Sequence, residues 1–476
     1  MANSPQMSGL VRQRRSPKSL PKLAVGLLLL IFQMLGCALK ETPSAGEVAR
    51  AALPDGTEIA DEWTAPEWDT GAVDDGWIAT FRDEELEALV AEAIANNLNL
   101  QVAAARVERA EAIVELAETG LKPVVGAGAE VSRIAGPEPL GGVVPVEGTR
   151  HSGGLNVAWE ADVWGRIRAG ISAAELSLEA ARADYEGARL SIAGATARAW
   201  FLAQELHLQV RLTQQVVQVL TELTALVRRN FEVGSVSRED VFLVGADLAA
   251  AEAAVRQARA VQTQVVRALE LLLGRYPAAS LEASRGLVAV PPPVPAGMPS
   301  ELLERRPDLI AAERRVAAAF RLEEQARLAR LPRFVFSGGV GGASALTGVV
   351  ANFASGVIVP IYAPALEAQI AIASADQKAA LAAYGQVVLR SLEEVETALF
   401  NDHIFGEREQ FLAAQVENNR KALAIHRKKL EVGQISALPV LQVQARLIGS
   451  EVLLLRVRND RLAQRTDLHL ALGGSF

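Results

Sequence analysis

The chain carries one structural plan twice, and this duplication limits the folds that it can adopt. The segment FEVGSVSREDVFLVGADLAAAE at 231–252 returns as LEVGQISALPVLQVQARLIGSE at 430–451, an offset of about 199 residues. Upstream, Pro123 pairs with Pro332 at an offset of about 209, so the copies differ by roughly ten residues in the segment between these blocks. We therefore expect two copies of one unit rather than two or three unrelated domains.

Both copies are expected to contain the same segments in the same order. An Ala-rich helix comes first, a Gly-rich pair of strands second, a very long helix third, and a further helix follows a VGxxS turn. A helix of 60 residues is roughly 90 Å long, which is longer than an ordinary globular core. In chain order, the expected helices are 84–120 with a break near Asn96 to Asn99, 171–230, 238–272, 300–330, 365–430 and 437–471.

Apolar residues step by alternating three and four along the helices that flank each turn. Such a sustained repeat predicts left-handed coiled-coil packing, so each copy is expected to form a tall antiparallel hairpin. In the second copy, Arg461 and Gln464 interrupt the stripe. In the first copy the stripe comprises Val241, Val244, Leu248, Ala251, Val255, Ala258, Gln262, Val265, Leu269 and Leu272.

The two turns, 231–237 and 430–436, have residues that end one helix and start the next. Gly234 and Gly433 can take the left-handed conformation that closes a helix. Ser237 and Ser436 can cap the following helix, and Asp240 stands where it would complete a near capping box with Ser237.

Four short segments are candidates for membrane-spanning strands. In the second of them, Leu155, Val157 and Trp159 alternate with Asn156 and Glu160. A strand of 9 to 11 residues with one apolar and one polar face is typical of an outer-membrane barrel, although a soluble hairpin with one wet face has the same pattern. The candidates are 123–133, 154–164, 333–342 and 352–362.

Four strands are too few to close a membrane barrel. The smallest such barrels have about eight strands, and an open edge in lipid leaves backbone groups unpaired. Several chains must then contribute four strands each. The simplest closed solution is a homotrimer with twelve strands and cyclic symmetry.

The N-terminus has the layout of a secretory signal peptide at 1–36. Basic residues precede an apolar stretch from Leu23 to Leu35, and Gly36 and the only cysteine, Cys37, follow. This arrangement looks like a bacterial lipobox, in which Cys37 is the site of lipidation. Because Ala38 rather than Asp follows Cys37, the sequence favours the outer membrane. Residues 37–76 are expected to be an acidic tether with Pro and Gly interruptions.

Charge and motifs argue against several classes of function. The net charge of −8 and the absence of a dense basic run after residue 22 disfavour a nucleic-acid partner. After residue 37, no stretch approaches the roughly 20 apolar residues of a membrane helix. The sequence has no GxxxxGK[ST] phosphate loop and no HExxH motif, and its five histidines are scattered. We therefore expect no enzyme activity, no catalytic residues, no cofactor and no metal.

Several stretches resemble the outer-membrane efflux protein family of the TolC and OprM type, most closely its NodT-like lipoprotein branch. The resemblance covers nearly the whole mature chain. Its most specific stretch is GMPSELLERRPDLIAAERRV at 297–316. The others are WIATFRDEEL at 77–86, NNLNLQVAAARVERA at 96–110, WEADVWGR at 159–166, LLLGRYP at 271–277, SLEEVETAL at 391–399 and LALGG at 470–474.

The resemblance implies a mainly helical fold with a small β part, assembled as a trimer with a twelve-stranded barrel and a helical periplasmic tunnel. The repeats would be 77–274 and 300–476, and the Pro-rich insert 275–299 would belong to a belt around the tunnel. The hairpin tips with Gly234, Ser237, Gly433 and Ser436 would dock a periplasmic adaptor protein. The energy would come from an inner-membrane transporter, expected to be a proton-driven pump of the RND type.

The resemblance also bears on a periplasmic gate. Family members often carry aspartates after the second turn, where this chain has Pro439 and Gln442, whereas the first copy keeps Asp240. Asp240 and Gln442 are thus the gate candidates, with an incomplete acidic set.

The expected function is that of a lipid-anchored outer-membrane duct through which a tripartite pump expels small molecules. Two alternatives stay open at this stage. One is the outer-membrane duct of a type I protein secretion system, which shares the fold. The other, from a different class, is a periplasmic coiled-coil scaffold or adaptor lipoprotein.

The lipobox assignment predicts that Cys37→Ser abolishes acylation, because no other residue offers a thiol for lipid attachment. Metabolic labelling with palmitate checks this prediction. Label that persists in the Cys37→Ser protein would contradict it.

Overall fold

The computed structural model describes residues 45–57, 59–65, 71, 75–137, 145–284, 286–343 and 349–474. The predicted signal peptide 1–36 and lipidation site Cys37 lie outside these residues. The chain divides into two compact units. The sheet unit contains Leu121–Ala169 and Arg327–Tyr362, and the helical unit contains Thr42–Gly120, Gly170–Ala326 and Ala363–Phe476.

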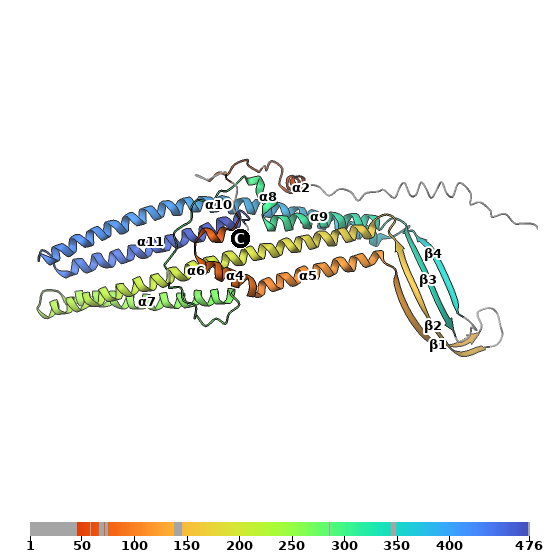
Figure 1. The fold of residues 1–476 in the computed structure, drawn as a ribbon, viewed down its shortest axis with the longest axis horizontal. Helices are drawn as coiled ribbons and strands as arrows, with labels where there is room; N and C mark the ends of the chain where they lie inside the picture. Colours follow the sequence, from red (N-terminus) through yellow and green to blue (C-terminus); the bar gives the residue numbers. More distant parts are fainter. Residues whose placement is uncertain are drawn as a thin grey trace, which may run out of the picture. The chain divides into compact units, whose positions relative to one another are not determined.

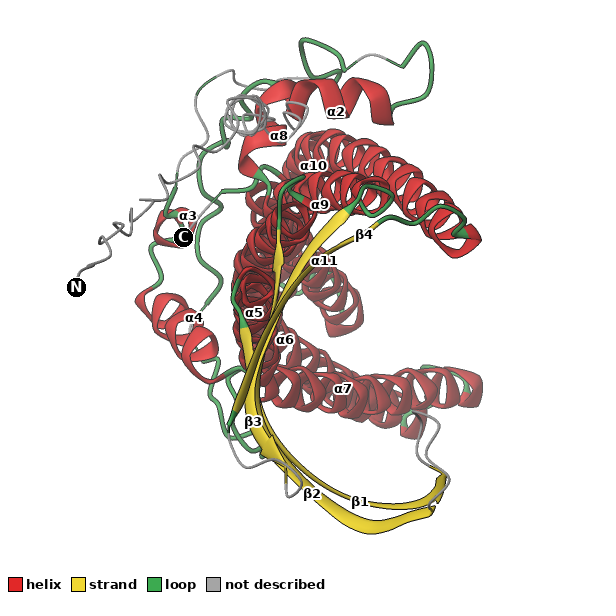
Figure 2. Cartoon of the chain, turned by 90° about the vertical axis from the view of Figure 1, so that its right-hand side faces the viewer, coloured by secondary structure: helices red, strands yellow, loops and turns green. Residues whose placement is uncertain are grey.

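The sheet unit is one antiparallel sheet with the strand order β1-β2-β3-β4. Figure 2 shows that its strands are strongly curved. All four predicted strands are present, at Val124–Pro137, Pro145–Ala161, Arg333–Ala343 and Val350–Ile358. The first two are longer than expected, 14 and 17 residues, because they pair with each other as far as Pro137 and Pro145.

Two of the predicted strand ends are wrong. β2 stops at Ala161, and Asp162 instead accepts hydrogen bonds from the backbone N–H groups of Ile167 and Arg168 at the start of the next helix. β4 stops at Ile358 rather than at residue 362. Pro360 has no N–H group for a sheet, and Pro364 begins a helix, so the chain leaves the sheet before Tyr362.

The helical unit is built around two antiparallel hairpins (Figure 1), α6 with α7 and α10 with α11. Viewed along the helices, they follow an arc from α10 to α7 (Figure 2). α6 and α10 contain 67 and 68 residues. The predicted range 365–430 matches α10 to within one residue, whereas α6 begins five residues before the predicted start at 171. The helices are α2 Ala45–Ala52, α3 Trp77–Thr80, α4 Glu84–Asn96, α5 Leu98–Glu118, η1 Thr119–Leu121, α6 Arg166–Glu232, α7 Arg238–Leu272, η2 Pro299–Glu301, α8 Leu302–Arg305, α9 Pro307–Leu328, α10 Pro364–Glu431 and α11 Ala437–Ala471.

The predicted stripe on α7 is confirmed, since every one of its members is buried or half-buried. In the second hairpin, Val440, Leu447 and Leu454 of α11 pack with Val416 and Leu423 of α10. The polar interruption of this stripe is also accommodated inside the hairpin. Two side chains of α11 there reach α10: Gln464 donates to the Ala398 carbonyl at 3.3 Å, and Arg461 forms an ion pair with Glu409 at 2.6 Å.

α11 is the one described helix that is long and apolar enough, by length and composition, to cross a membrane. The expectation that no segment after residue 37 has this property is therefore wrong for α11. Its apolar side chains have a partner in the structure, because α11 packs along α10. Hairpin packing therefore accounts for the apolar composition of α11.

The first helix of each copy is interrupted at equivalent positions. The break predicted near Asn96 to Asn99 is confirmed at Asn97, which caps α5 and donates to the Leu272 carbonyl at 2.9 Å. The uninterrupted helix predicted for 300–330 is wrong, because it breaks at Arg306. This residue precedes Pro307, which disfavours helical backbone, and it donates to the Ala471 carbonyl at 3.0 Å.

The hydrogen bonds of Asn97 and Arg306 occupy equivalent positions in the two copies. Asn97 and Arg306 are 209 residues apart, and their acceptors Leu272 and Ala471 are 199 apart, as the sequence offsets require. A side chain at the break thus satisfies a carbonyl at the end of the hairpin's second helix, where backbone acceptors lack helical partners.

The segment at 77–86 packs against α6 in an aromatic and aliphatic core of the helical unit. Trp77, Phe81 and Leu86 pack with Trp200 and Phe201 of α6, and all five are almost completely buried. The indole N–H of Trp200 donates to Asp83 at 2.9 Å, and the same carboxylate caps α4. The segment at 77–86 is thus fixed to the long helix by both packing and polar contacts.

Glu270, at the end of α7, anchors the segment that leaves the first repeat. Its carboxylate is fully buried and accepts four hydrogen bonds, which come from the backbone N–H groups of residues 279–281 and the Ser280 hydroxyl. Burial alone would raise the pKa of Glu270, but these hydrogen bonds outweigh it and lower the pKa.

Replacing Glu270 by Ala should destabilise the helical unit by about 2–4 kcal/mol, because buried N–H groups lose their acceptor. Since the pKa of Glu270 is lowered in the folded chain, its contribution is complete above the ordinary carboxyl pKa and is lost as the pH falls through the lowered value. Thermal unfolding followed by circular dichroism at several pH values measures both effects. Equal acid sensitivity in the wild type and the variant would contradict the assignment.

Candidate functional site

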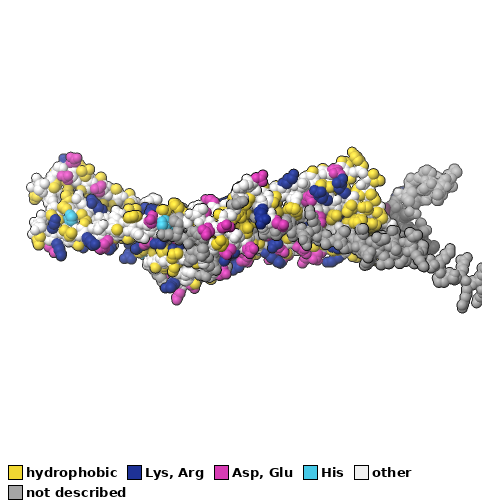
Figure 3. All heavy atoms as spheres, turned by 90° about the horizontal axis from the view of Figure 1, so that it is seen from above, with side chains coloured by type: hydrophobic (Ala, Val, Ile, Leu, Met, Phe, Trp, Pro, Cys, Tyr) yellow, Lys and Arg dark blue, Asp and Glu magenta, His cyan; other side chains and the backbone are white. Residues whose placement is uncertain are grey.

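The sheet has one continuous apolar face, which is the first candidate functional surface. Residues that lie directly opposite each other share a face, and Val125, Val157, Gly338 and Phe353 form one such row across all four strands. Val125 is 65% exposed and Phe353 is 76% exposed. Figure 3 shows hydrophobic side chains gathering over the strands, whereas charged side chains are spread over the helices. An exposed apolar surface of this kind marks contact with lipid or protein.

The opposite face of the sheet is polar and rich in glycine. Its rows include Asn156 with Gly339 and Asn352, and Glu130 with Ser152. The predicted alternation of β2 is confirmed. In β1, β3 and β4 the same division of faces follows from the pairing register.

The two outer strands of the sheet have one unpaired side each. β1 pairs only with β2 and β4 pairs only with β3 among the described strands. Their outward N–H and C=O groups require either water or another strand. A single chain therefore holds an incomplete sheet that can accept a strand at either edge.

The first hairpin tip is fixed by both a glycine and a capping box. Gly234 has a φ of 74°, and its N–H group donates to the Phe231 carbonyl at 2.9 Å. The Ser235 N–H donates to the Asn230 carbonyl at 2.9 Å, which completes a Schellman motif. Asp240 and Ser237 cap α7 reciprocally, and the hydrogen bonds from Ser237 lower the pKa of the Asp240 carboxyl.

The second tip has the same turn without the capping box. Gly433 has a φ of 72° and closes α10 by the same pair of backbone bonds, with Leu430 and Lys429 as acceptors. Ser436 occupies the N-cap position, but its side chain makes no capping hydrogen bond, so the predicted cap is wrong. The third residue of α11 is Pro439, which has no N–H group to donate to the serine hydroxyl.

Both tips expose apolar side chains that the single chain leaves uncovered. Phe231, Val233 and Phe242 are exposed at the first tip, and Leu430 and Val432 at the second. These residues surround Gly234 and Gly433, which the sequence analysis assigned to partner docking. Docking at these residues stays a prediction.

The two gate candidates lie on equivalent helices of the two hairpins. Asp240 is exposed near the start of α7, where its carboxylate is already bound to Ser237. Gln442 is exposed near the start of α11. Their part in a gate stays a prediction.

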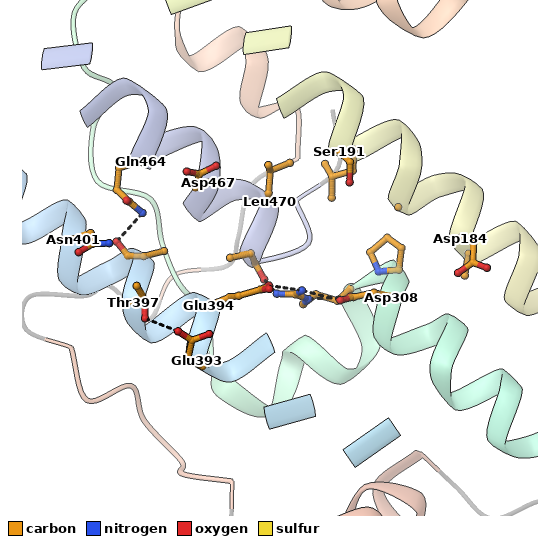
Figure 4. A pocket seen from close by; sticks show the side chains of 17 residues that line it. Asp184, Ser191, Asp308, Glu393, Glu394, Thr397, Asn401, Gln464, Asp467 and Leu470 are labelled. Atoms are coloured by element: carbon orange, nitrogen blue, oxygen red, sulfur yellow. Dashed lines mark hydrogen bonds and ion pairs between the residues drawn. The ribbon is translucent and has the colours of Figure 1, made fainter. Parts of the chain in front are cut away.

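A pocket that the sequence did not predict lies at Arg306, between α6 and the second repeat (Figure 4), and has a volume of about 650 Å³. The Arg306 guanidinium pairs with Asp308 at 2.8 Å and with Glu394 at 2.7 Å. Burial alone would lower the pKa of Arg306, but these two carboxylates raise it. The signal in the sequence was the specific stretch RRPD, whose arginine holds three elements of the repeat together.

No group of three or more His, Cys, Asp and Glu residues that could hold a metal ion occurs in the described ranges. The geometry instead supplies a lipid-compatible sheet face, open sheet edges and two hairpin tips.

These features agree with the comparisons to known proteins. Residues 89–275 and 298–474 match the family described as outer membrane efflux protein. The chain belongs to the outer membrane efflux protein family. The two matched segments correspond to the two structural repeats, and the gap between them falls in the Pro-rich insert.

Individual relatives are similar over most of their length. The chain is 29% identical to the pyoverdine export outer membrane protein OpmQ of Pseudomonas putida, over 94% of this chain and 97% of that protein. It is 26% identical to the cation efflux system protein CusC of Escherichia coli, over 84% and 88%. Among solved structures, the outer-membrane channel OprN superposes with a TM-score of 0.80 and 27% identity, over 89% of this chain and 99% of that chain.

Gly234→Ala and Gly433→Ala should each destabilise a hairpin tip by about 1–2 kcal/mol, because a residue with a Cβ atom is strained at positive φ. Gly245→Ala in α7 and Gly449→Ala in α11 are matched controls. Both have open space around an added Cβ and should stabilise their helices by up to about 1 kcal/mol. Amide hydrogen exchange at the tips measures the differences, and equal protection in all four variants would contradict the turn assignment.

Proposed function

We propose that this chain is the outer-membrane channel subunit of a tripartite efflux pump, a passive exit duct for small molecules. The observation that carries the proposal is the four-stranded sheet, which has an exposed apolar face and two unpaired edges. Its family membership and its similarity to one protein named for outer-membrane export and another named for cation efflux support the same function. The chain's own role requires no catalysis.

Three copies would complete the duct. Joining β4 of one copy to β1 of the next pairs every edge strand, so that twelve strands close a barrel without free backbone groups in lipid. The apolar face would then contact the hydrocarbon region and the polar, glycine-rich face would line the pore. The two hairpins of each chain would give six in all, arranged as the wall of a tunnel.

The proposed partners would dock at the hairpin tips. The exposed apolar residues around Gly234 and Gly433 would form the docking surface for a periplasmic adaptor protein, which links the duct to an inner-membrane transporter. A proton-driven transporter of the RND type is the proposed source of energy. Asp240 and Gln442 would lie near the entrance and contribute to its gate.

The N-terminal segment would connect the duct to the outer membrane through a lipid on Cys37. Its described part is fixed to the helical unit, since Glu396 of α10 accepts hydrogen bonds from the backbone of Thr64 at 2.8 Å and Ala65 at 3.1 Å. The Trp63 indole donates to the Gly297 carbonyl at 3.0 Å. Together, 37–76 and the insert 275–299 would form the belt.

Single-channel recording tests the duct directly. The purified full chain in a planar lipid bilayer should give discrete conductance steps, and these should become larger or more frequent in the Gly234→Ala and Gly433→Ala double variant, whose tips are loosened. The Gly245→Ala and Gly449→Ala double variant is the matched control. If none of these proteins gives discrete conductance, a periplasmic scaffold is the better assignment.

Cross-linking tests the shared barrel. Cysteines at Ser132 in β1 and Asn352 in β4, at opposite edges of the sheet, should be joined between copies by a thiol cross-linker of suitable length and give covalent trimers on a denaturing gel. In the control pair Ala158→Cys and Ser337→Cys, the residues face each other within one chain and should give monomers only. Trimers in the control, or monomers for every edge pair along β1 and β4, would contradict the assembly.

A further inference from the structure

A second cavity lies between the two hairpins and has no place in the duct function. Its volume is about 490 Å³, and its lining comes from α6 and α7 of the first hairpin and α11 of the second. Leu202, Leu206 and Val261 give it apolar walls. The polar lining side chains are Glu205, Gln209, Gln257, Arg456, Asn459 and Asp460.

Glu205 is the buried charge at this cavity. The residue is only 3% exposed, yet no ion pair within 4 Å to the described residues holds its carboxylate. When the Gln209 amide is oriented to satisfy both neighbours, its N–H donates to Glu205 at 3.3 Å and its oxygen accepts from Arg456 at 2.6 Å, which is the one hydrogen bond that Glu205 receives from the described residues. A carboxylate has about four acceptor positions, so most of those on Glu205 remain available to a molecule in the cavity.

The charges around the cavity favour a positive ligand. α6 contributes Glu205 and α11 contributes Asp460, whereas Arg456 is the single base in the lining. Arg456 is exposed and engages Gln209, and none of the lining residues of α7 is charged. Arg408 acts on Asp460 from outside the lining. The deeply buried Glu205 therefore lacks a close counter-ion, which is a costly arrangement for a charged carboxylate.

We propose that this inter-hairpin cavity binds a small hydrophobic cation, with Glu205 as its counter-ion and Leu202, Leu206 and Val261 as its apolar contacts. The expected ligand is an amine or quaternary ammonium compound that carries one aromatic or branched hydrocarbon group. A ligand of this kind supplies the missing positive charge and covers the apolar walls at once. A neutral molecule of the same shape covers the apolar walls but supplies no charge for Glu205.

Proton binding gives the site a distinct signature. Burial raises the pKa of Glu205 to about 7, with the nearby Arg456 lowering it and Asp460 raising it further. The carboxyl is thus mostly neutral at pH 6 and mostly ionised at pH 8. Because a proton and the cation compete for the same carboxylate, the affinity should rise about tenfold between these pH values.

Isothermal titration calorimetry on the detergent-solubilised full chain tests the proposal with benzyltrimethylammonium as the probe and its neutral isostere neopentylbenzene as the comparison. The wild type should bind the cation with an affinity that rises about tenfold from pH 6 to pH 8. Glu205→Gln should weaken binding at pH 8 at least tenfold and remove the pH dependence. Glu205→Asp should restore part of both.

Two further variants separate the site from general effects. Glu252→Gln removes an exposed carboxylate from α7 without touching the cavity, and it should bind as the wild type does. Ala254→Phe narrows the cavity from an exposed position while leaving every charge in place, and it should weaken binding at both pH values.

The proposal is overturned if the wild type binds the cation no better than Glu205→Gln, or if neopentylbenzene binds as tightly as the cation. It is also overturned if Glu252→Gln weakens binding as much as Glu205→Gln does. Should Glu205→Gln fail to fold, two other measurements decide the question. The site is rejected if Ala254→Phe binds the cation with unchanged affinity, or if the affinity of the wild type does not change between pH 6 and pH 8.

Discussion

The requirement that backbone N–H and C=O groups be paired away from water governs the whole design. Four strands leave two edges, β1 and β4, and each edge carries groups that lipid cannot satisfy. The exposed apolar face of the sheet also requires a partner, because burying it against lipid or protein removes apolar surface from water. A chain with these properties is part of a larger closed structure, and each of its two repeats supplies two strands and one helical hairpin to such an assembly.

The two repeats solve the same structural problem with different side chains. In the first, the neutral amide of Asn97 satisfies the end of α7, and in the second the buried guanidinium of Arg306 satisfies the end of α11. The charged solution requires partners, and Asp308 and Glu394 provide them. At the tips it is the first repeat that has more hydrogen bonds. The first tip has a capping box, whereas the second, with Pro439, relies on the glycine turn alone. Equal backbone geometry therefore does not mean equal stability at the two tips.

The buried charged residues of the helical unit differ in how many hydrogen bonds and ion pairs stabilise their charge. Glu270 has four hydrogen bonds that keep it ionised, and Arg465, almost fully buried, pairs with Asp402 at 3.0 Å. Glu205 has one hydrogen bond and faces a cavity. Because the cost of burying a charge depends on what surrounds it, the two buried glutamates have different properties. Glu270 and Arg465 hold segments together, whereas Glu205 has the properties of a binding group.

The sequence by itself determined the elements and their order. The long apolar stripes, the absence of proline from 166–275 and the glycines at 234 and 433 specified every helix end of both hairpins to within five residues, because these signals act within a few helical turns. The division of β2 into two faces was equally local. The ends of β2 and β4 and the missing cap at Ser436 depend on the nearby residues Asp162, Pro360 and Pro439, whose effect the alternation and the serine position did not reveal. Only the tertiary structure decided the hydrogen bond of Arg306 to the Ala471 carbonyl and the setting of Glu205. The first depends on a partner far away in the chain and the second on a cavity between helices, and no local pattern records either.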